Sequence, residues 1–83
     1  MSEAIRTPRQ LGSLIHNERV RRGLSQQELA NLAGTGQKTI SRIETGHEGA
    51  KLDTLFRLLA VLQLEIRFTP RSVANSKSIG DVF

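Results

Sequence analysis

The sequence of 83 residues contains no cysteine, so it can form neither a disulfide nor a thiolate metal site. Its two histidines, His16 and His47, lie far apart, and a zinc site would have to recruit carboxylates. We therefore expect no metal and no other cofactor. Neither histidine has a nucleophile at an informative spacing, so we expect no enzymatic activity. The chain is short enough to predict one small domain without a separate catalytic unit.

Long apolar runs are also missing. No stretch approaches the roughly 18 residues of a membrane span, and the first residues lack the apolar segment of a signal peptide. We therefore expect a cytoplasmic protein with no membrane partner. Acidic residues are fewer than basic ones, 8 against 12, which gives a formal net charge of +4. This surplus suits a polyanionic partner, but the same surplus on other proteins merely keeps the surface solvated.

Short helices account for most of residues 7–62. Thr7-Pro8-Arg9-Gln10 predicts the start of the first, because threonine can cap a helix, proline suits its first position and glutamine can complete a capping box. Ser25-Gln26-Gln27-Glu28 is a second capping box and predicts the start of the next helix. A third is expected from about Gln37 to Thr45. Glycines that are typical of helix ends punctuate the segment at Gly23, Gly34 and Gly46.

Apolar residues recur at helical spacing within each segment and predict one shared core. In the first three helices the inward residues are Leu11, Leu14, Ile15, Leu29, Ala30, Ala33, Ile40 and Ile43. In the fourth helix the predicted stripe is Leu52, Leu55, Phe56, Leu59 and Leu62, with Leu58 widening it. The expected fold is all-α, a compact four-helix domain.

The second and third helices are joined only by Gly34-Thr35-Gly36, a short glycine-containing turn typical of a helix-turn-helix. Placing Ile40 and Ile43 inward leaves an outer face that carries no acidic side chain. Glutamine can pair with adenine, and lysine or arginine with guanine, in the major groove. An ordinary solvated face would have a similar composition, but the turn favours DNA recognition. The predicted base-reading residues are Gln37, Lys38, Ser41 and Arg42.

Two charged residues continue apolar stripes toward the core. Arg19 follows Ile15 at i+4, and Glu44 follows Ile40 at i+4. An unpaired buried ion costs several kcal/mol, so we expect Arg19 and Glu44 to form a salt bridge that ties the first helix to the third.

The segment from Gln10 to Leu62, about two thirds of the chain, resembles the lambda-repressor-like helix-turn-helix family, also called the Cro/C1 or XRE type. The matching residues are Leu24-Ser25-Gln26-Gln27-Glu28-Leu29-Ala30, then Gly34, then Thr39-Ile40-Ser41-Arg42-Ile43-Glu44-Thr45-Gly46, then Leu52-Asp53-Thr54-Leu55. The resemblance implies that Gln26 grips a DNA phosphate and that Gln37, Lys38 and Arg42 read bases.

The same resemblance places Thr35 and Thr39, together with Ser41, among positions that touch bases or backbone, and it matches the Arg19–Glu44 pair to a family salt bridge. His47 and Lys51, which follow the third helix, could also meet phosphate. Lys51 departs from the family, in which a serine or threonine commonly caps the fourth helix.

Residues 63–70 contain an alternating apolar and polar run that ends at Pro70 and predicts a β-strand. A lone strand needs a neighbour. The arm around Ile5 (residues 1–6) is one candidate, and the same strand of a second chain is the other, which we favour. Antiparallel pairing centred on Ile66 would set Glu65 opposite Arg67 of a second copy. The expected dimerisation residues are Leu64, Glu65, Ile66, Arg67 and Phe68.

This architecture is most similar to HipB-type antitoxins, as is the start Ile5-Arg6-Thr7-Pro8-Arg9-Gln10-Leu11. The resemblance implies a homodimer that binds palindromic double-stranded DNA, represses its own operon and binds a HipA-like serine/threonine kinase toxin. Residues 71–83 read as a flexible tail, or as a toxin-docking peptide through Ile79, Val82 and Phe83. Two alternatives stay open, namely a stand-alone or phage-type repressor and a protein-binding module that no longer contacts DNA.

Overall fold

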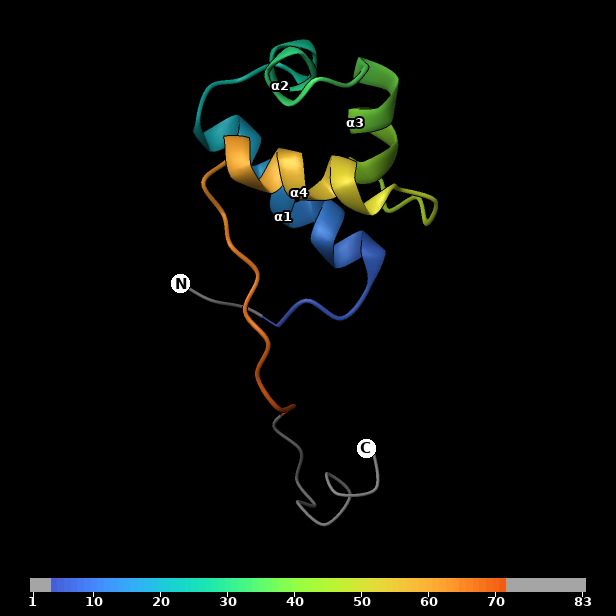
Figure 1. Cartoon of the computed structure of the whole chain (residues 1–83), viewed down its shortest axis with the longest axis vertical. Coiled ribbons are helices and arrows are strands. Elements are labelled where there is room, and N and C mark those ends of the chain that lie inside the picture. The colour runs from blue at the N-terminus through green and yellow to red at the C-terminus, as the bar shows by residue number, and fades with distance from the viewer. Residues whose placement is uncertain (1–3, 72–83) are drawn as a thin grey trace.

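The computed structural model describes residues 4–71, which form four α-helices. They are α1 (Pro8–Arg21), α2 (Gln26–Ala33), α3 (Gln37–Glu44) and α4 (Leu52–Val61). Helix α3 packs against both α1 and α2, and α4 packs against α2 (Figure 1). The predicted all-α, four-helix fold is confirmed. None of these four helices has the length and hydrophobicity needed to cross a membrane.

Side-chain caps fix where the first two helices begin. Ser25 and Glu28 form the complete capping box, since each side chain accepts a hydrogen bond from the other residue's backbone N–H. Thr7 caps α1 by accepting from the N–H of Gln10. The box predicted there is only partly formed, because the side chain of Gln10 accepts from the N–H of Arg6 instead. The side chain of Gln10 therefore bonds to the residue before the N-cap, Arg6, and not to the N-cap Thr7 as a capping box requires.

The core is built from apolar side chains of all four helices and of Leu62, which follows α4. The fully buried ones are Ile15, Leu29, Ile40, Leu58 and Leu62. Ala30, Ala33, Ile43 and Leu59 fill the spaces between them. Because α2 and α3 share this core with α1 and α4, the inner side of α3 is held in place while its outer face stays on the surface.

The predicted stripe of α4 is wrong at its N-terminal end. Leu52 and Phe56 are 69% and 52% exposed, whereas Thr54 is buried and Leu58 is inaccessible to solvent. Leucine and phenylalanine occupy more than one face of this helix, so periodicity alone could not say which face turns inward. The helix is rotated to centre Leu58 in the core, and this leaves apolar side chains on the molecular surface.

The chain after α4 turns sharply at Gln63, which has a positive φ of 57°. The N–H of Leu64 then bonds to the carbonyl of Leu59 at 2.8 Å, and this closes the helix end. Residues 64–71 form no strand within the described part of the chain, and they do not pair with the arm at Ile5. Pairing with a second copy stays a prediction. The proposed docking residues Ile79, Val82 and Phe83 lie outside the described residues.

A close contact between α1 and α3 depends on Gly12, which sequence reasoning did not single out. Gly12 is buried in the middle of α1. A Cβ atom at this position would collide with the carbonyl oxygen of Ile43 and lie 2.8 Å from that of Glu44. Both oxygens belong to backbone and cannot rotate away. Glycine therefore lets α1 approach the C-terminal turn of α3.

We predict that Gly12→Ala lowers the free energy of unfolding by about 1–3 kcal/mol, the usual cost of overpacking. Alanine is the better helix former by about 1 kcal/mol. The sign of the change in the free energy of unfolding therefore shows whether the steric clash or the helix propensity of alanine has the larger effect. The control is Gly49→Ala, because its added Cβ would meet only ordinary contacts. Urea unfolding followed by circular dichroism measures both variants. Equal or greater stability of Gly12→Ala would contradict the close contact.

Candidate nucleic-acid interface

A bidentate ion pair joins α1 to the C-terminal end of α3. The Nε of Arg19 lies 2.6 Å from one carboxylate oxygen of Glu44, and its Nη2 lies 3.1 Å from the other. The two side chains are only 11% and 4% exposed. Arg19 also donates to the carbonyl oxygen of Leu24 at 2.7 Å. The arginine therefore orients the carboxylate and, in addition, fixes the chain that leads into α2.

The carboxylate of Glu44 is also the centre of a wider network. It accepts a hydrogen bond from Gln26 Nε2 at 3.1 Å and lies 2.9 Å from Nδ1 of His16. Gln26 in turn accepts from Nε2 of Gln37 at 3.3 Å. An unbroken series of contacts thus runs from the buried ion pair to the first residue of α3. Sequence reasoning missed the part played by His16, although its position three residues before Arg19 places both on one helix face.

The pKa of Glu44 reflects two opposing effects. Burial penalises the charged carboxylate and would raise its pKa. Hydrogen bonds from Arg19, His16 and Gln26, together with the charge of Arg19, outweigh this penalty and lower the pKa below its ordinary value. Glu44 is therefore ionised at neutral pH and acts as a hydrogen-bond acceptor only.

We predict that Glu44→Ala lowers the free energy of unfolding by about 3 kcal/mol near neutral pH, because it leaves the guanidinium of Arg19 without its partner. A lowered pKa in the folded state stabilises the fold above the ordinary pKa of about 4.5, and that contribution is lost as the pH falls below it. The difference between wild type and Glu44→Ala should therefore shrink in acid.

Glu48→Ala is the matched control, since Glu48 is exposed in the loop after α3. Chemical unfolding at several pH values between about 3 and 7 measures both differences. A Glu44→Ala difference that is small, or that does not change with pH, would contradict the role assigned to the ion pair.

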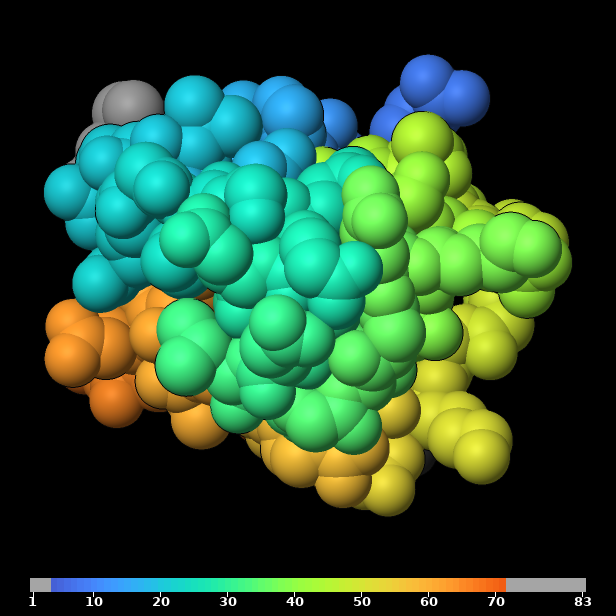
Figure 2. Space-filling view, turned by 90° about the horizontal axis from the view of Figure 1, so that it is seen from above, coloured from blue at the N-terminus to red at the C-terminus, as the bar shows by residue number. Residues whose placement is uncertain are grey.

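The outer face of α3 carries the residues predicted to read bases. Gln37, Lys38 and Arg42 are exposed, and Ser41 is half-buried. On the opposite side of the helix Ile40 and Ile43 lie in the core. Seen from above, α2 and α3 together form one continuous face of the molecule (Figure 2). The structure therefore gathers the four predicted side chains on a single supported surface.

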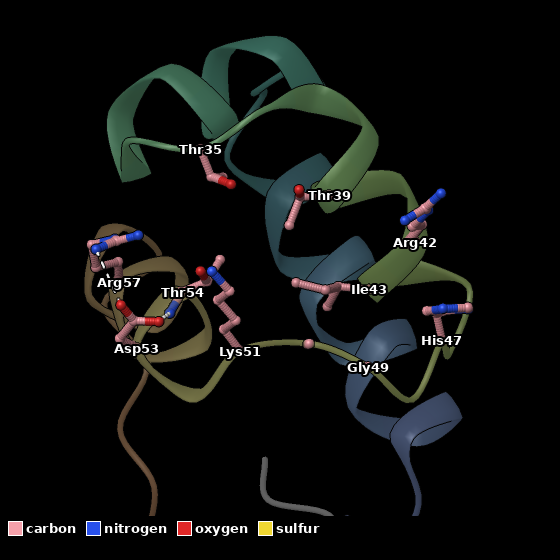
Figure 3. Close-up of a pocket in the computed structure, with 11 residues that line it drawn as sticks. Thr35, Thr39, Arg42, Ile43, His47, Gly49, Lys51, Asp53, Thr54 and Arg57 are labelled. Atoms are coloured by element: carbon pink, nitrogen blue, oxygen red, sulfur yellow. Dashed lines mark hydrogen bonds and ion pairs between the residues drawn. The ribbon is translucent and has the colours of Figure 1, made fainter.

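A groove on the other flank of α3 separates it from the start of α4. Thr35, Thr39, Arg42, His47 and Lys51 line the groove, as do Asp53, Thr54 and Arg57 (Figure 3). In this view the Lys51 side chain extends beside Thr54, in the direction of Thr35. Four of the five residues predicted to contact the DNA backbone thus lie together here. The fifth, Gln26, lies by Gln37 on the opposite flank.

A further basic residue of this groove is Arg57, which sequence reasoning did not select. Its guanidinium lies 3.8 Å from the carboxylate of Asp53, one turn earlier in α4. Both side chains are at least half exposed, so the pair is weak and leaves Arg57 able to reach an anion. The groove therefore has three permanent cations, those of Arg42, Lys51 and Arg57, against one carboxylate among its lining residues.

Comparison with known proteins gives consistent matches. A family model described as helix-turn-helix matches residues 15–68. An HTH-type transcriptional regulator of Haemophilus influenzae is 41% identical over 54 residues, which are 65% of this chain and 55% of that protein. The antitoxin HipB of Escherichia coli is 32% identical over 92% of this chain and 86% of its own length. A chain of a solved HipA–HipB–O2–O3 complex superimposes with a TM-score of 0.76 at 32% identity, over 82% of this chain and 96% of that one.

Proposed function

This chain belongs to the XRE-type helix-turn-helix family of transcriptional regulators, and we propose that it represses transcription by placing α3 in the major groove of an operator. The observation that carries the proposal is the outer face of α3. Three exposed polar side chains lie there on a helix whose other side is locked into the core. An α-helix fits the major groove, where each base pair presents a distinct pattern of donors and acceptors.

The residues around α3 are proposed to hold the DNA backbone. Gln26 lies at the N-terminus of α2 on one flank, and Thr35, Thr39, His47 and Lys51 line the groove on the other. Backbone contacts of this kind orient a protein on the duplex, whereas the base contacts of α3 give specificity. Arg57 adds a cation to the same flank. The arrangement supports binding that weakens steeply with salt, because phosphate contacts release counterions.

We predict that Lys38→Ala and Arg42→Ala each weaken operator binding by about 1–3 kcal/mol, because each removes a contact to guanine. Binding to a scrambled duplex should weaken much less. Fluorescence anisotropy at fixed salt measures both affinities. Arg21→Ala is the control, since Arg21 is an exposed arginine at the end of α1 that pairs with Glu18. An equal loss on both duplexes would show that these two residues contact only phosphate.

We further propose that the repressor is a homodimer. Leu52 and Phe56 of α4 are exposed, as are Ile66 and Phe68 of the segment that follows it, with Phe68 at 95%. Apolar side chains this exposed favour a partner surface. Glu65 and Arg67 pair with each other within the chain at 2.7 Å, and antiparallel pairing of two copies would let them exchange partners. A two-fold axis would then place two copies of α3 about 34 Å apart, as a palindromic operator requires.

The biological setting that we propose is a toxin–antitoxin module. Its support is the similarity to the antitoxin HipB over 86% of that protein, and the similarity to a chain of a solved HipA–HipB–O2–O3 complex. In this proposal the chain represses its own operon and binds and neutralises a HipA-like serine/threonine kinase toxin. Co-purification with the product of the adjacent gene would separate this function from that of a stand-alone repressor.

We predict that deleting residues 79–83 weakens binding to the toxin and leaves operator affinity unchanged, because Ile79, Val82 and Phe83 are the sizeable apolar groups of the deleted segment. Isothermal titration with the purified toxin and anisotropy with operator DNA measure the two affinities. A truncated chain that binds the toxin as tightly as the full chain would remove the docking role from these residues.

A further inference from the structure

We propose that Thr54 is a further residue that holds the DNA backbone, and that its side-chain hydroxyl donates a hydrogen bond to a phosphate seated in the groove between α3 and α4. This role rests on the proposed function, because it adds a contact to the flank of α3 that is proposed to meet the backbone. The sequence does not place Thr54 among the residues predicted to contact DNA. A buried threonine on the inner side of a helix would ordinarily be assigned to packing alone.

The hydroxyl of Thr54 is a polar group that has no partner in the folded chain. The residue is 6% exposed. Asp53 accepts a hydrogen bond from the backbone N–H of Thr54 at 2.8 Å, but no hydrogen bond among residues 4–71 involves the Thr54 hydroxyl. A hydroxyl removed from bulk water without a hydrogen bond costs free energy, and valine would fill the same space without this cost. Folding alone therefore gives no reason for a hydroxyl at this position.

This hydroxyl opens onto the groove. Among residues 4–71, no side-chain oxygen or nitrogen that is fully shielded from solvent lacks a hydrogen bond. The unbonded Oγ1 of Thr54 must therefore stay accessible, and Thr54 lines the groove beside α3 (Figure 3). Of the residues that line this groove, Ile43 and Thr54 are the buried ones. The floor of the groove is thus apolar except for one unsatisfied hydroxyl.

The groove suits a phosphate group in both size and charge. Its volume is about 390 Å³, which exceeds the roughly 30 Å³ that one water molecule occupies in the liquid. Arg42, Lys51 and Arg57 give its walls three positive charges, against the one carboxylate of Asp53. That carboxylate is already engaged, since one oxygen accepts from the N–H of Thr54 and the other lies 3.8 Å from Arg57. The lining therefore has a net positive charge.

The first turn of α4 adds to the attraction for an anion. Its N-cap, Lys51, makes no side-chain cap hydrogen bond, in contrast to the N-caps of α1 and α2. A helix N-terminus carries a partial positive charge and favours a nearby anion. Because Lys51, Asp53 and Thr54 all line the groove, this turn borders the space that the phosphate would occupy.

A DNA phosphate in the groove would give the hydroxyl of Thr54 the acceptor that it lacks. Threonine side chains are common donors to phosphate oxygens, and a hydrogen bond to a charged acceptor is stronger than one to a neutral acceptor. Every nucleotide carries the same phosphate, so this contact contributes affinity and register but no base preference. Thr54 would thus strengthen binding to any duplex that α3 can enter.

Two substitutions separate the hydroxyl of Thr54 from its methyl group. Thr54→Val keeps the shape and removes the hydroxyl, whereas Thr54→Ser keeps the hydroxyl and removes a buried methyl group. In urea unfolding we expect Thr54→Val to be at least as stable as the wild type and Thr54→Ser to be less stable. In DNA binding we expect the opposite order. Thr69→Val is the matched control, because Thr69 is exposed in the segment after α4 and does not line the groove.

Fluorescence anisotropy with the full chain measures affinity for the operator and for a scrambled duplex. We expect Thr54→Val to weaken binding about 10- to 100-fold, the range of a hydrogen bond to a charged group, and by the same factor on both duplexes. Thr54→Ser and Thr69→Val should bind as the wild type does. The salt dependence should stay unchanged in Thr54→Val, because a hydroxyl carries no charge, whereas Arg57→Ala should reduce its slope by about one.

Replacing single operator phosphates by neutral methylphosphonates identifies the phosphate that Thr54 contacts. At one position the two changes should be non-additive, because Thr54→Val removes little more once that phosphate has lost its charge. At the other positions the two losses should add. This arm needs only Thr54→Val, so it decides the question if Thr54→Ser does not fold by circular dichroism.

Wild-type affinity of Thr54→Val for the operator would overturn the inference. An equal loss in folded Thr54→Ser would do so too, since the methyl group would then matter and not the hydroxyl, as would additive losses at every phosphate. Failure of Thr54→Val to fold would show that the hydroxyl serves the fold, which also contradicts the proposal. A wild-type chain that does not prefer its operator over the scrambled duplex would instead refute the proposed function, before any Thr54 variant is compared.

Discussion

The carboxylate of Glu44 accepts hydrogen bonds from α1 and α2 while belonging to α3, and it connects the buried ion pair to the surface that we propose to face DNA. Its bond to Arg19 holds the first helix against the third. Its bond to Gln26 connects this anchor to the start of α2 and from there to Gln37. A single buried charge thereby links the stability of the domain to the side chains proposed to meet DNA.

The small size of the domain explains why this anchor matters. Nine buried apolar residues form the core of the described part, and α3 has only eight residues. A helix this short is not stable alone in water. Its position is set by Ile40 and Ile43 in the core, by the close approach to α1 at Gly12 and by the ion pair. Rigid support of this kind lets a short helix present side chains at fixed positions.

Features carried by local patterns could be predicted from the sequence. The capping box of Ser25 and Glu28 and the glycine turn define where α2 begins and ends. The pairing of Arg19 with Glu44 could be inferred because each charge continues an apolar stripe that leads into the core. The four side chains on the outer face of α3 followed from placing Ile40 and Ile43 inward. In each case the feature follows from residues close together in the sequence or from the need to pair a buried charge.

Features that depend on the packing of distant segments could not be predicted in the same way. The rotation of α4 that exposes Leu52 and Phe56 is decided by the other helices, because its apolar residues fit more than one face. The need for glycine at position 12 appears only when α3 lies against α1. The proximity of His16 to Glu44, 28 residues later, also requires the folded chain. The strand predicted after α4 is absent from the described residues, and its pairing with a second copy stays a prediction.

The central claim is that α3 enters the major groove of an operator, and dimethyl sulfate footprinting of the DNA upstream of this gene tests it directly. This reagent methylates guanine N7 in the major groove and adenine N3 in the minor groove. The account predicts that bound protein protects guanine N7 in two clusters about one helical turn apart. Protection confined to adenine N3, or binding that leaves every guanine N7 reactive, would contradict it.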